Sequence, residues 1–235
     1  MKKIGFFVVL VLVAGGIAVW LQQQKGAPPP AAPAAVKPVD VAAVRAKAEV
    51  GDPAAQVELG HVLQQGNGVK RDPKEALAWF QKAADKGYPE AWVAVGEMTQ
   101  AGQGVKSDPA EAARLYRLAA EQGNVAGQYD LAYLYEGGTG VARSETEAAK
   151  WYQLAAEGGD ALAQYNMGMR YKDGAGVKAD RAQAYKWLTL AAAQGQGDAV
   201  QALKSVKADL SAAELTAASR LVQEFVPRKP AAAKP

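Results

Sequence analysis

The stretch Ala55-Gln56-Val57-Glu58-Leu59-Gly60 opens a block that returns every 36 residues, at Ala91, Gly127 and Ala163. No insertion or deletion interrupts the four copies. A fixed period of this length indicates a stack of similar small units rather than one globular enzyme core. Such a stack presents a long surface to a partner, so the period by itself favours a binding protein.

Each copy is predicted to contain two helices joined by a glycine loop. In the third copy, apolar residues recur at helical spacing over 125–136. Gly138 and Gly140 then end the helix, because glycine adopts positive φ angles without steric cost. The second helix opens at a capping box over 144–147 and ends at Gly159. We therefore expect an all-α fold: a right-handed α-solenoid of about four 36-residue helix-loop-helix repeats with capping helices, after a single N-terminal apolar helix.

The repeated motifs resemble those of the Sel-one-like repeat family, a relative of the tetratricopeptide repeat. The resemblance rests on residues 163–168, 174–177, 180–184 and 151–159, and it covers roughly residues 51–195. It implies a superhelical array in which the first helices line a groove. It also implies an adaptor role, because members of this family mostly act in assembly, quality control, secretion and signalling.

The chain is expected to divide into four segments. Residues 1–25 form a signal anchor or transmembrane helix (or a signal peptide), because residues 4–21 are almost wholly apolar and follow Lys2 and Lys3. Residues 26–40 are a Pro/Ala-rich linker, residues 41–226 are the repeat solenoid with its caps, and residues 227–235 are a disordered tail. Within the solenoid, 42–50 and 199–206 are expected to be flanking helices, and a helix from the capping box at 210–214 is expected to reach about Val226.

The same N-terminal pattern sets the expected location. An uncleaved anchor places the protein in the inner membrane as a single-pass protein, with the repeats in the periplasm. The alternative is a secreted or periplasmic protein after signal cleavage, for which Gly16-Ile17-Ala18 offers a weak site. The two lysines mark the cytoplasmic side in either case.

The distribution of charge argues against a nucleic-acid partner. The formal net charge is +3, but the first forty residues and the tail each contribute +3, which leaves residues 41–226 at −3. A near-neutral body without a basic stripe lacks the electrostatic footprint of nucleic-acid binding.

No pattern of catalytic, metal-binding or cofactor-binding residues is visible. His61 is the only histidine and the chain has no cysteine, which removes structural zinc and thiol catalysis. The Gly-x-Gly elements follow helices and lack a third glycine, so they are turns rather than phosphate cradles. We expect no enzyme, no metal and no cofactor.

The candidate partner groove is predicted from positions where the first helices of the four copies differ. Residues about half a turn from the small-residue stripe are expected to face outward, as an apolar strip with a charged rim suited to a peptide or helix. The candidates are Glu58, His61, Val62, Glu97, Met98, Asp130, Tyr133, Leu134, Asn166, Met169 and Arg170.

Three functions follow from these observations. The first is a non-catalytic protein-protein interaction scaffold, tethered to the membrane and binding an unidentified protein or peptide in the cell envelope. The alternative is an accessory or regulatory protein of cell-wall or exopolysaccharide machinery, a role found among bacterial relatives. A β-lactam-binding enzyme is least favoured, because the relatives linked to that activity are rich in disulfides and this chain has no cysteine.

Overall fold

The computed structural model describes residues 39–228, and within this range all regular structure is helical. The expected anchor and most of the linker and tail lie outside the described residues. Of the described helices, none combines the length and apolar character needed to cross a membrane. The helices are α2 (Val41–Glu49), α3 (Pro53–Gln65), α4 (Pro73–Ala84), α5 (Pro89–Ala101), α6 (Pro109–Glu121), α7 (Val125–Gly137), α8 (Glu145–Glu157), α9 (Ala161–Asp173), α10 (Arg181–Ala193), α11 (Gly197–Ala208) and α12 (Ala212–Gln223).

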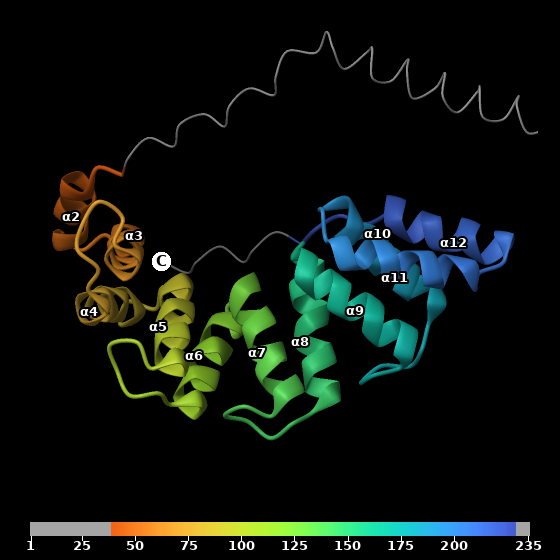
Figure 1. Ribbon diagram of the computed structural model, residues 1–235, viewed down its shortest axis with the longest axis horizontal. Helices are drawn as coiled ribbons and strands as arrows, with labels where there is room; N and C mark the ends of the chain where they lie inside the picture. Colours follow the sequence, from red (N-terminus) through yellow and green to blue (C-terminus); the bar gives the residue numbers. More distant parts are fainter. Residues whose placement is uncertain (1–38, 229–235) are drawn as a thin grey trace, which may run out of the picture. The chain divides into compact units, whose positions relative to one another are not determined.

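The helices pair as the 36-residue period predicts. Each repeat is one antiparallel pair, α3 with α4, α5 with α6, α7 with α8 and α9 with α10, and each pair packs on the next (Figure 1). Helix α2 covers α3 at one end of the stack, whereas α11 and α12 both pack on α10 at the other. The expected all-α solenoid of four repeats with capping helices is confirmed for this part of the chain.

Local sequence signals set where the helices begin and end. The carboxylate of Asp108 accepts hydrogen bonds from the backbone N–H groups of Ala110 and Glu111, both at 3.1 Å, directly before α6. Gly138 ends α7 with φ of 70°, the left-handed conformation that a side chain would strain. The helix predicted to reach Val226 ends instead at Gln223, because the chain leaves α12 there and turns back toward the repeats.

The second glycine of each loop allows the repeats to approach one another. At Gly140 (φ 69°) an added Cβ would overlap the carbonyl oxygen of Pro109, the first residue of α6 in the preceding repeat. The same overlap recurs between Gly176 and Glu145 at the start of α8. The loops of repeats two, three and four therefore rest on the start of the second helix one repeat earlier, where an added side chain would overlap the backbone.

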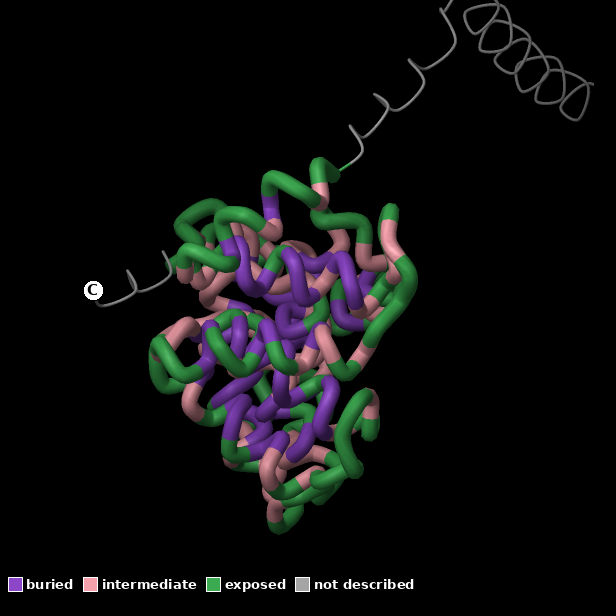
Figure 2. Tube along the Cα trace, turned by 90° about the vertical axis from the view of Figure 1, so that its left-hand side faces the viewer, coloured by how far each residue is buried: buried purple, intermediate pink, exposed green. Residues whose placement is uncertain are grey.

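Small residues and aromatic rings alternate in the core as expected. Tyr116, Tyr152 and Trp187, from the second helices, are at most 2% exposed. An added Cβ on Gly96 would lie 2.7 Å from Tyr116, so the missing side chain makes room for that ring. The buried positions run through the middle of the helix pairs and the exposed ones gather on the loops (Figure 2). Packing of repeat on repeat thus forms the core, because a single pair of short helices could not bury both faces.

Candidate functional site

Three of the apolar candidates are core residues, so their expected place on an exposed strip is wrong. Val62, Met98 and Leu134 occupy the same position in successive repeats and are 4%, 0% and 1% exposed. Each lies three residues after a buried residue of the same helix, such as Leu131 before Leu134. Residues three apart share a helix face, so this position turns inward with the core stripe.

Arg170 takes this same core position in the fourth repeat and is only 4% exposed. Its guanidinium donates hydrogen bonds to Glu136 at 2.6 Å and to Glu145 at 2.7 Å, and its Cζ lies 5.2 Å from the centre of the Tyr152 ring. Tyr152 in turn donates its hydroxyl hydrogen to Glu136 at 2.9 Å. The expected rim position of Arg170 is therefore corrected to that of a buried ion-pair centre joining repeats three and four.

The other candidates remain accessible to different degrees. Glu58, Glu97 and Tyr133 are exposed, whereas His61, Asp130, Asn166 and Met169 are half-buried. Helix α5 contacts both α3 and α7, while the second helices of neighbouring repeats approach one another less closely. The first helices therefore line the inner side of the stack, where the resemblance placed the groove.

A hollow of about 560 Å³ opens on this inner side between repeats two and three. It brings together the candidates Glu97 and Asp130, with Tyr133 beside them. The candidates of repeats one and four do not line it. We call it the acid–tyrosine groove, and its lining residues are Glu97, Gln100, Ala101, Tyr116, Tyr129, Asp130 and Tyr133.

The acid–tyrosine groove carries negative charge without a counter-charge. Loss of surrounding water raises the pKa of Asp130 to about 7, with smaller contributions from the charges of Glu97 and Asp160. Glu97 stays exposed at the rim, yet neighbouring groups shield its carboxyl enough to raise its pKa, and the charge of His61 opposes that shift. Within residues 39–228 neither Glu97 nor Asp130 forms an ion pair. A cation entering the groove would supply the missing charge.

Tyrosine rings form the walls of the groove. Tyr133 is 56% exposed, which is unusual for so large a ring on the inner face of a stack. Tyr129 packs edge-on against Tyr152 with ring centres 5.5 Å apart, and Tyr116 donates its hydroxyl hydrogen to Gln100 at 3.0 Å. The walls are held in place by these contacts, whereas Tyr133 is free to cover a ligand.

Sequence reasoning missed Gln100, Tyr116 and Tyr129 as groove residues. Tyr116 and Tyr129 both pack between helices, but each also lines the groove. A signal existed, because Tyr116 and Gln100 are matched one repeat later by Tyr152 and Glu136, which form the same hydroxyl contact.

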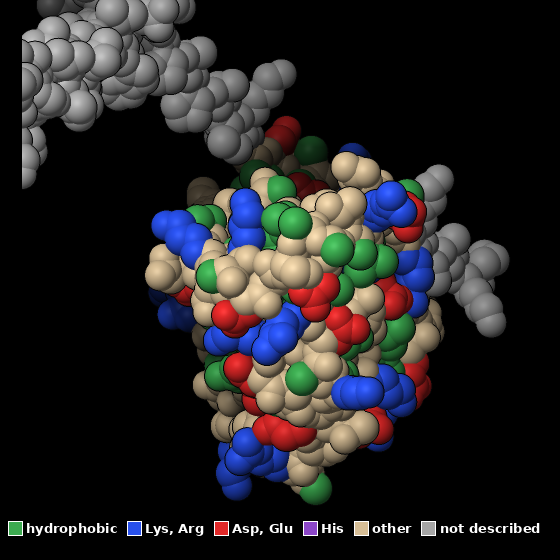
Figure 3. All heavy atoms as spheres, turned by 90° about the vertical axis from the view of Figure 1, so that its right-hand side faces the viewer, with side chains coloured by type: hydrophobic (Ala, Val, Ile, Leu, Met, Phe, Trp, Pro, Cys, Tyr) green, Lys and Arg blue, Asp and Glu red, His purple; other side chains and the backbone are tan. Residues whose placement is uncertain are grey.

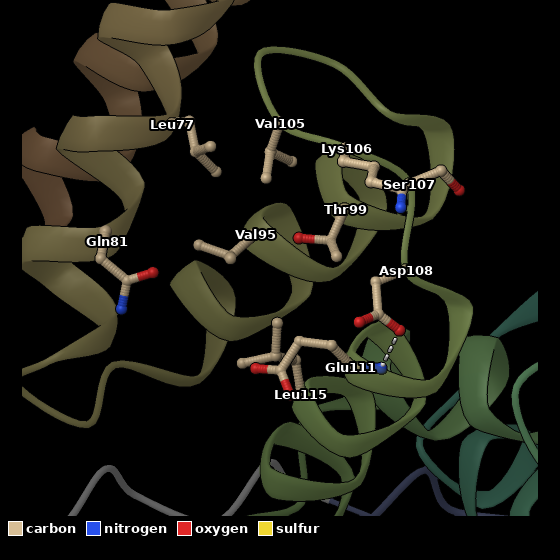
Figure 4. Close-up of a pocket in the computed structure, with 10 residues that line it drawn as sticks. All are labelled: Leu77, Gln81, Val95, Thr99, Val105, Lys106, Ser107, Asp108, Glu111 and Leu115. Carbon is tan, nitrogen blue, oxygen red and sulfur yellow. Dashed lines mark hydrogen bonds between the residues drawn. The ribbon is translucent and has the colours of Figure 1, made fainter.

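A second hollow, of about 360 Å³, lies on the opposite side between repeats one and two (Figure 4). Leu77 and Val95 form part of its wall, with Asp108 and Glu111 beside them. Its acidic groups are already used, since Asp108 caps α6 and Glu111 forms an ion pair with Arg114 at 2.7 Å. Its basic side chain, Lys106, forms no ion pair among residues 39–228, but the hollow offers a cation no unpaired carboxylate. The acid–tyrosine groove is therefore the stronger candidate for a cationic ligand.

We next searched residues 39–228 for a metal-binding cluster and for a continuous basic surface. Among residues 39–228, no three His, Asp or Glu side chains are grouped to hold a metal ion. Figure 3 shows Lys and Arg interspersed with Asp and Glu on the face at the α11–α12 end. No continuous basic surface is present on that face.

Stacked helix pairs with an open, tyrosine-walled groove on their first helices define an α-solenoid of the interaction type. The Sel1 repeat pattern matches residues 53–88, 89–124, 125–160 and 161–196, which together make up more than half of the chain. This chain belongs to the Sel1 repeat family. Proteins of this family are generally non-catalytic scaffolds that bind protein partners.

Solved structures similar to this one come from bacteria. A Sel1 repeat protein from Oxalobacter formigenes is 36% identical, with a TM-score of 0.66 over 71% of this chain and 48% of its own. A protective antigen of uropathogenic Escherichia coli with an SLR fold is 26% identical, with a TM-score of 0.53 over 81% of this chain and 49% of its own. An immunity protein from Pseudomonas aeruginosa, at 21% identity, a TM-score of 0.51 and coverage of 88% and 89%, shows the fold alone.

This chain spans about half the length of the first two of these structures. No curated protein matches its sequence. The comparisons therefore support the fold and the general scaffold role, and the partner has to be argued from the groove.

Proposed function

We propose that this protein is a membrane-tethered interaction scaffold whose acid–tyrosine groove binds a basic segment of a partner protein in the bacterial periplasm. The observation that carries the binding role is the half-buried Asp130 beside Glu97, in a hollow of about 560 Å³ that no Lys or Arg side chain lines. A structural role would leave these carboxylates paired, as the glutamates around Arg170 are.

The chemistry of the groove selects the partner. A Lys or Arg side chain extending past Tyr133 would place its charge near Asp130 and Glu97, where reduced contact with water strengthens the attraction. The tyrosine rings would pack along its aliphatic stem and favour the cation over their faces. An apolar neighbour in the partner segment would cover the exposed ring of Tyr133.

The location rests on residues outside the described range. Lys2 and Lys3 followed by the apolar run 4–21 support an anchor that leaves the repeats in the periplasm. The Pro-rich stretch 26–38 would hold the repeats away from the bilayer. Alkaline extraction of membranes checks the anchor, since a cleaved, secreted chain would be recovered in the soluble fraction and would lack the first residues.

Site-specific photo-crosslinking in living cells tests the groove. A photoreactive phenylalanine analogue at Tyr133 is expected to capture a partner, whereas the same analogue at exposed Arg114 on α6 is not. The variant Glu97→Gln/Asp130→Asn should abolish capture from position 133 while helicity and melting stay within the normal range. Equal capture from both positions, or capture that survives the double substitution, would remove the groove from the proposal. A captured cell-wall or polysaccharide enzyme would direct the function to that machinery.

The pH dependence of partner binding provides a second test. A bound cation favours the ionised form of Asp130, so binding should tighten as pH rises from 6 to 8, across its pKa of about 7. The other titratable groups facing it are Glu97 and Asp160, with His61 acting on Glu97. Isothermal titration at the two pH values in buffers of different ionisation heat would detect the released proton. The Asp130→Asn chain should lose most of the pH dependence.

A further inference from the structure

In the first and last repeats, a side chain just after the second helix bonds to the loop before the first helix, and we call this place the junction. Residue 86 of repeat one, and its equivalents 122, 158 and 194, directly precede the glycine that follows each second helix. The Lys86 ammonium donates to the carbonyl of Gly51. Gln194 donates its amide hydrogens to Gly159 O at 3.0 Å and to Gln164 Oε1 at 2.9 Å. Both side chains reach back 35 residues, to the loop that precedes the first helix of their own repeat.

The third repeat has Gly158 at this position and cannot close its junction in this way. An added Cβ would lie 2.5 Å from Val125 Cγ2, so a side chain would fit here only if Val125 moved. A hollow of about 370 Å³ remains, and its floor is Gln128, which is 2% exposed. Gln128 Nε2 donates to Ala120 O at 3.1 Å, whereas its Oε1 has no hydrogen-bond partner among residues 39–228. The Oε1 of Gln56 in repeat one also has no hydrogen-bond partner among the described residues, but there Lys86 bonds across the junction.

The end of the described chain lies against this junction. Phe225 packs edge-on against Trp187 with ring centres 5.4 Å apart, and Pro227 lies over Gly159. The backbone N–H of Arg228 donates to Glu157 O at 2.7 Å, and its guanidinium donates to Leu154 O at 3.3 Å. Residues 225–228 thus cross from α10 to the last turn of α8, where Arg228 forms one wall of the hollow.

The groups around the hollow suit a cationic hydrogen-bond donor. Helices α6 and α8 both end beside it, and helix C-termini carry partial negative charge and free carbonyl groups. Glu121 adds a carboxylate and Trp151 an aromatic ring. Gln128 Oε1 still needs a donor. A guanidinium can serve several of these acceptors at once, because its five N–H groups form a planar fork.

We propose that the hollow opposite Gly158 is a binding site for an arginine-bearing protein segment, and that the chain's own Phe225–Arg228 is its replaceable resident ligand. Arg228 is exposed and its guanidinium makes one long bond, while Gln128 Oε1 stays unpartnered. A partner segment whose arginine reaches Gln128 would make a bond that the resident does not. This site shares no lining residue with the acid–tyrosine groove, so the two are tested separately.

A peptide titration followed by backbone amide NMR tests the proposal. The full chain carrying Phe225→Ala/Arg228→Ala, with the site vacated, is titrated with a peptide of residues 222–228 and with the same peptide containing citrulline in place of arginine. We expect the arginine peptide to shift the amide signals of Gly123, Gln128 and Gly159 at millimolar concentration, the range in which a tethered segment competes. The arginine peptide should bind the unaltered chain about tenfold more weakly than it binds the vacated chain. The citrulline peptide should likewise bind the vacated chain about tenfold more weakly than the arginine peptide does.

A matched pair of variants in the vacated chain shows whether the floor of the hollow takes part. Freed from its covalent link to α12, the arginine of the peptide can move onto Gln128 Oε1, which the resident Arg228 does not reach. Gln128→Met should therefore weaken the arginine peptide, whereas Gln164→Met, which loses the equivalent bond to a carbonyl in repeat four, should not. Thermal melting checks that both variants fold. Equal binding of the two peptides, equal binding to the vacated and unaltered chains, no shift at millimolar peptide, or equal effects of the two variants would each overturn the proposal.

Discussion

Two regions of this protein remove charge from water, and they do so in opposite ways. At Arg170 the buried guanidinium has two carboxylates within 2.7 Å and an aromatic ring beside it. At Asp130 the half-buried carboxylate has another acid as its neighbour and no ion pair within the described residues. The charge of Arg170 is paired, whereas that of Asp130 is not. The difference separates a charge that holds two repeats together from a charge that awaits a ligand.

The largest expected effect comes from placing an arginine where no acid can meet it. Met98 occupies the Arg170 position in repeat two. Its neighbours in repeat one are Gln64 and Pro73, which stand where Arg170 meets Glu136 and Glu145 of repeat three. Met98→Arg should lower the free energy of unfolding by about 3–5 kcal/mol, measured by urea denaturation. Adding Gln64→Glu, at the position equivalent to Glu136, should recover part of the loss. If Met98→Arg alone is tolerated, burial at this position is less complete than the structure indicates.

Removing the paired arginine should cost somewhat less. Arg170→Ala leaves a cavity and removes the cation that bridges Glu136 and Glu145. Both glutamates are partly exposed, so water can hydrate them. We expect a loss of about 2–4 kcal/mol, read from the same denaturation curves. Arg170→Met should restore most of it, because an apolar side chain fills this position in the other repeats. Equal losses for both variants would show that the charge, rather than the filled volume, stabilises the junction.

The smallest effect is expected at Asp130, and its size depends on pH. The folded pKa of about 7 lies above that of an unfolded aspartate, so the folded state binds more protons between about pH 4 and 7. The contribution of Asp130 to stability is therefore present at low pH and is lost as pH rises through 7. Asp130→Asn should be more stable than the unaltered chain by about 1 kcal/mol at pH 8, after allowance for partial exposure. The difference should vanish near pH 4 in thermal melts. A constant difference would mean that Asp130 titrates normally.

Much of the fold was predictable because the signals are local. Asp108 before Pro109, and Gly138 after α7, specify a helix start and a helix end through hydrogen bonds within a few residues. The period then repeats these signals four times, so the helix pairs could be placed without knowing their contacts.

The candidate site was only partly predictable. Glu97, Asp130 and Tyr133 do meet in one groove, whereas Val62, Met98 and Leu134 lie in the core. The interpretation failed there because first helices pack on both their own second helix and the neighbouring repeat. This widens the buried face beyond the stripe that one helix pair would need.

The amino-acid sequence by itself determined the all-α class, the four repeats and the caps and turns that bound their helices, because each depends on residues close together in the chain. It also determined which residue types are available for chemistry: one histidine and no cysteine. Only the tertiary structure decided that Arg170 lies inside, that Asp130 lacks a counter-charge, and that Arg228 reaches the junction at Gly158. These depend on contacts between residues up to 74 positions apart, and their strength comes from water excluded by neighbours that the local sequence does not specify.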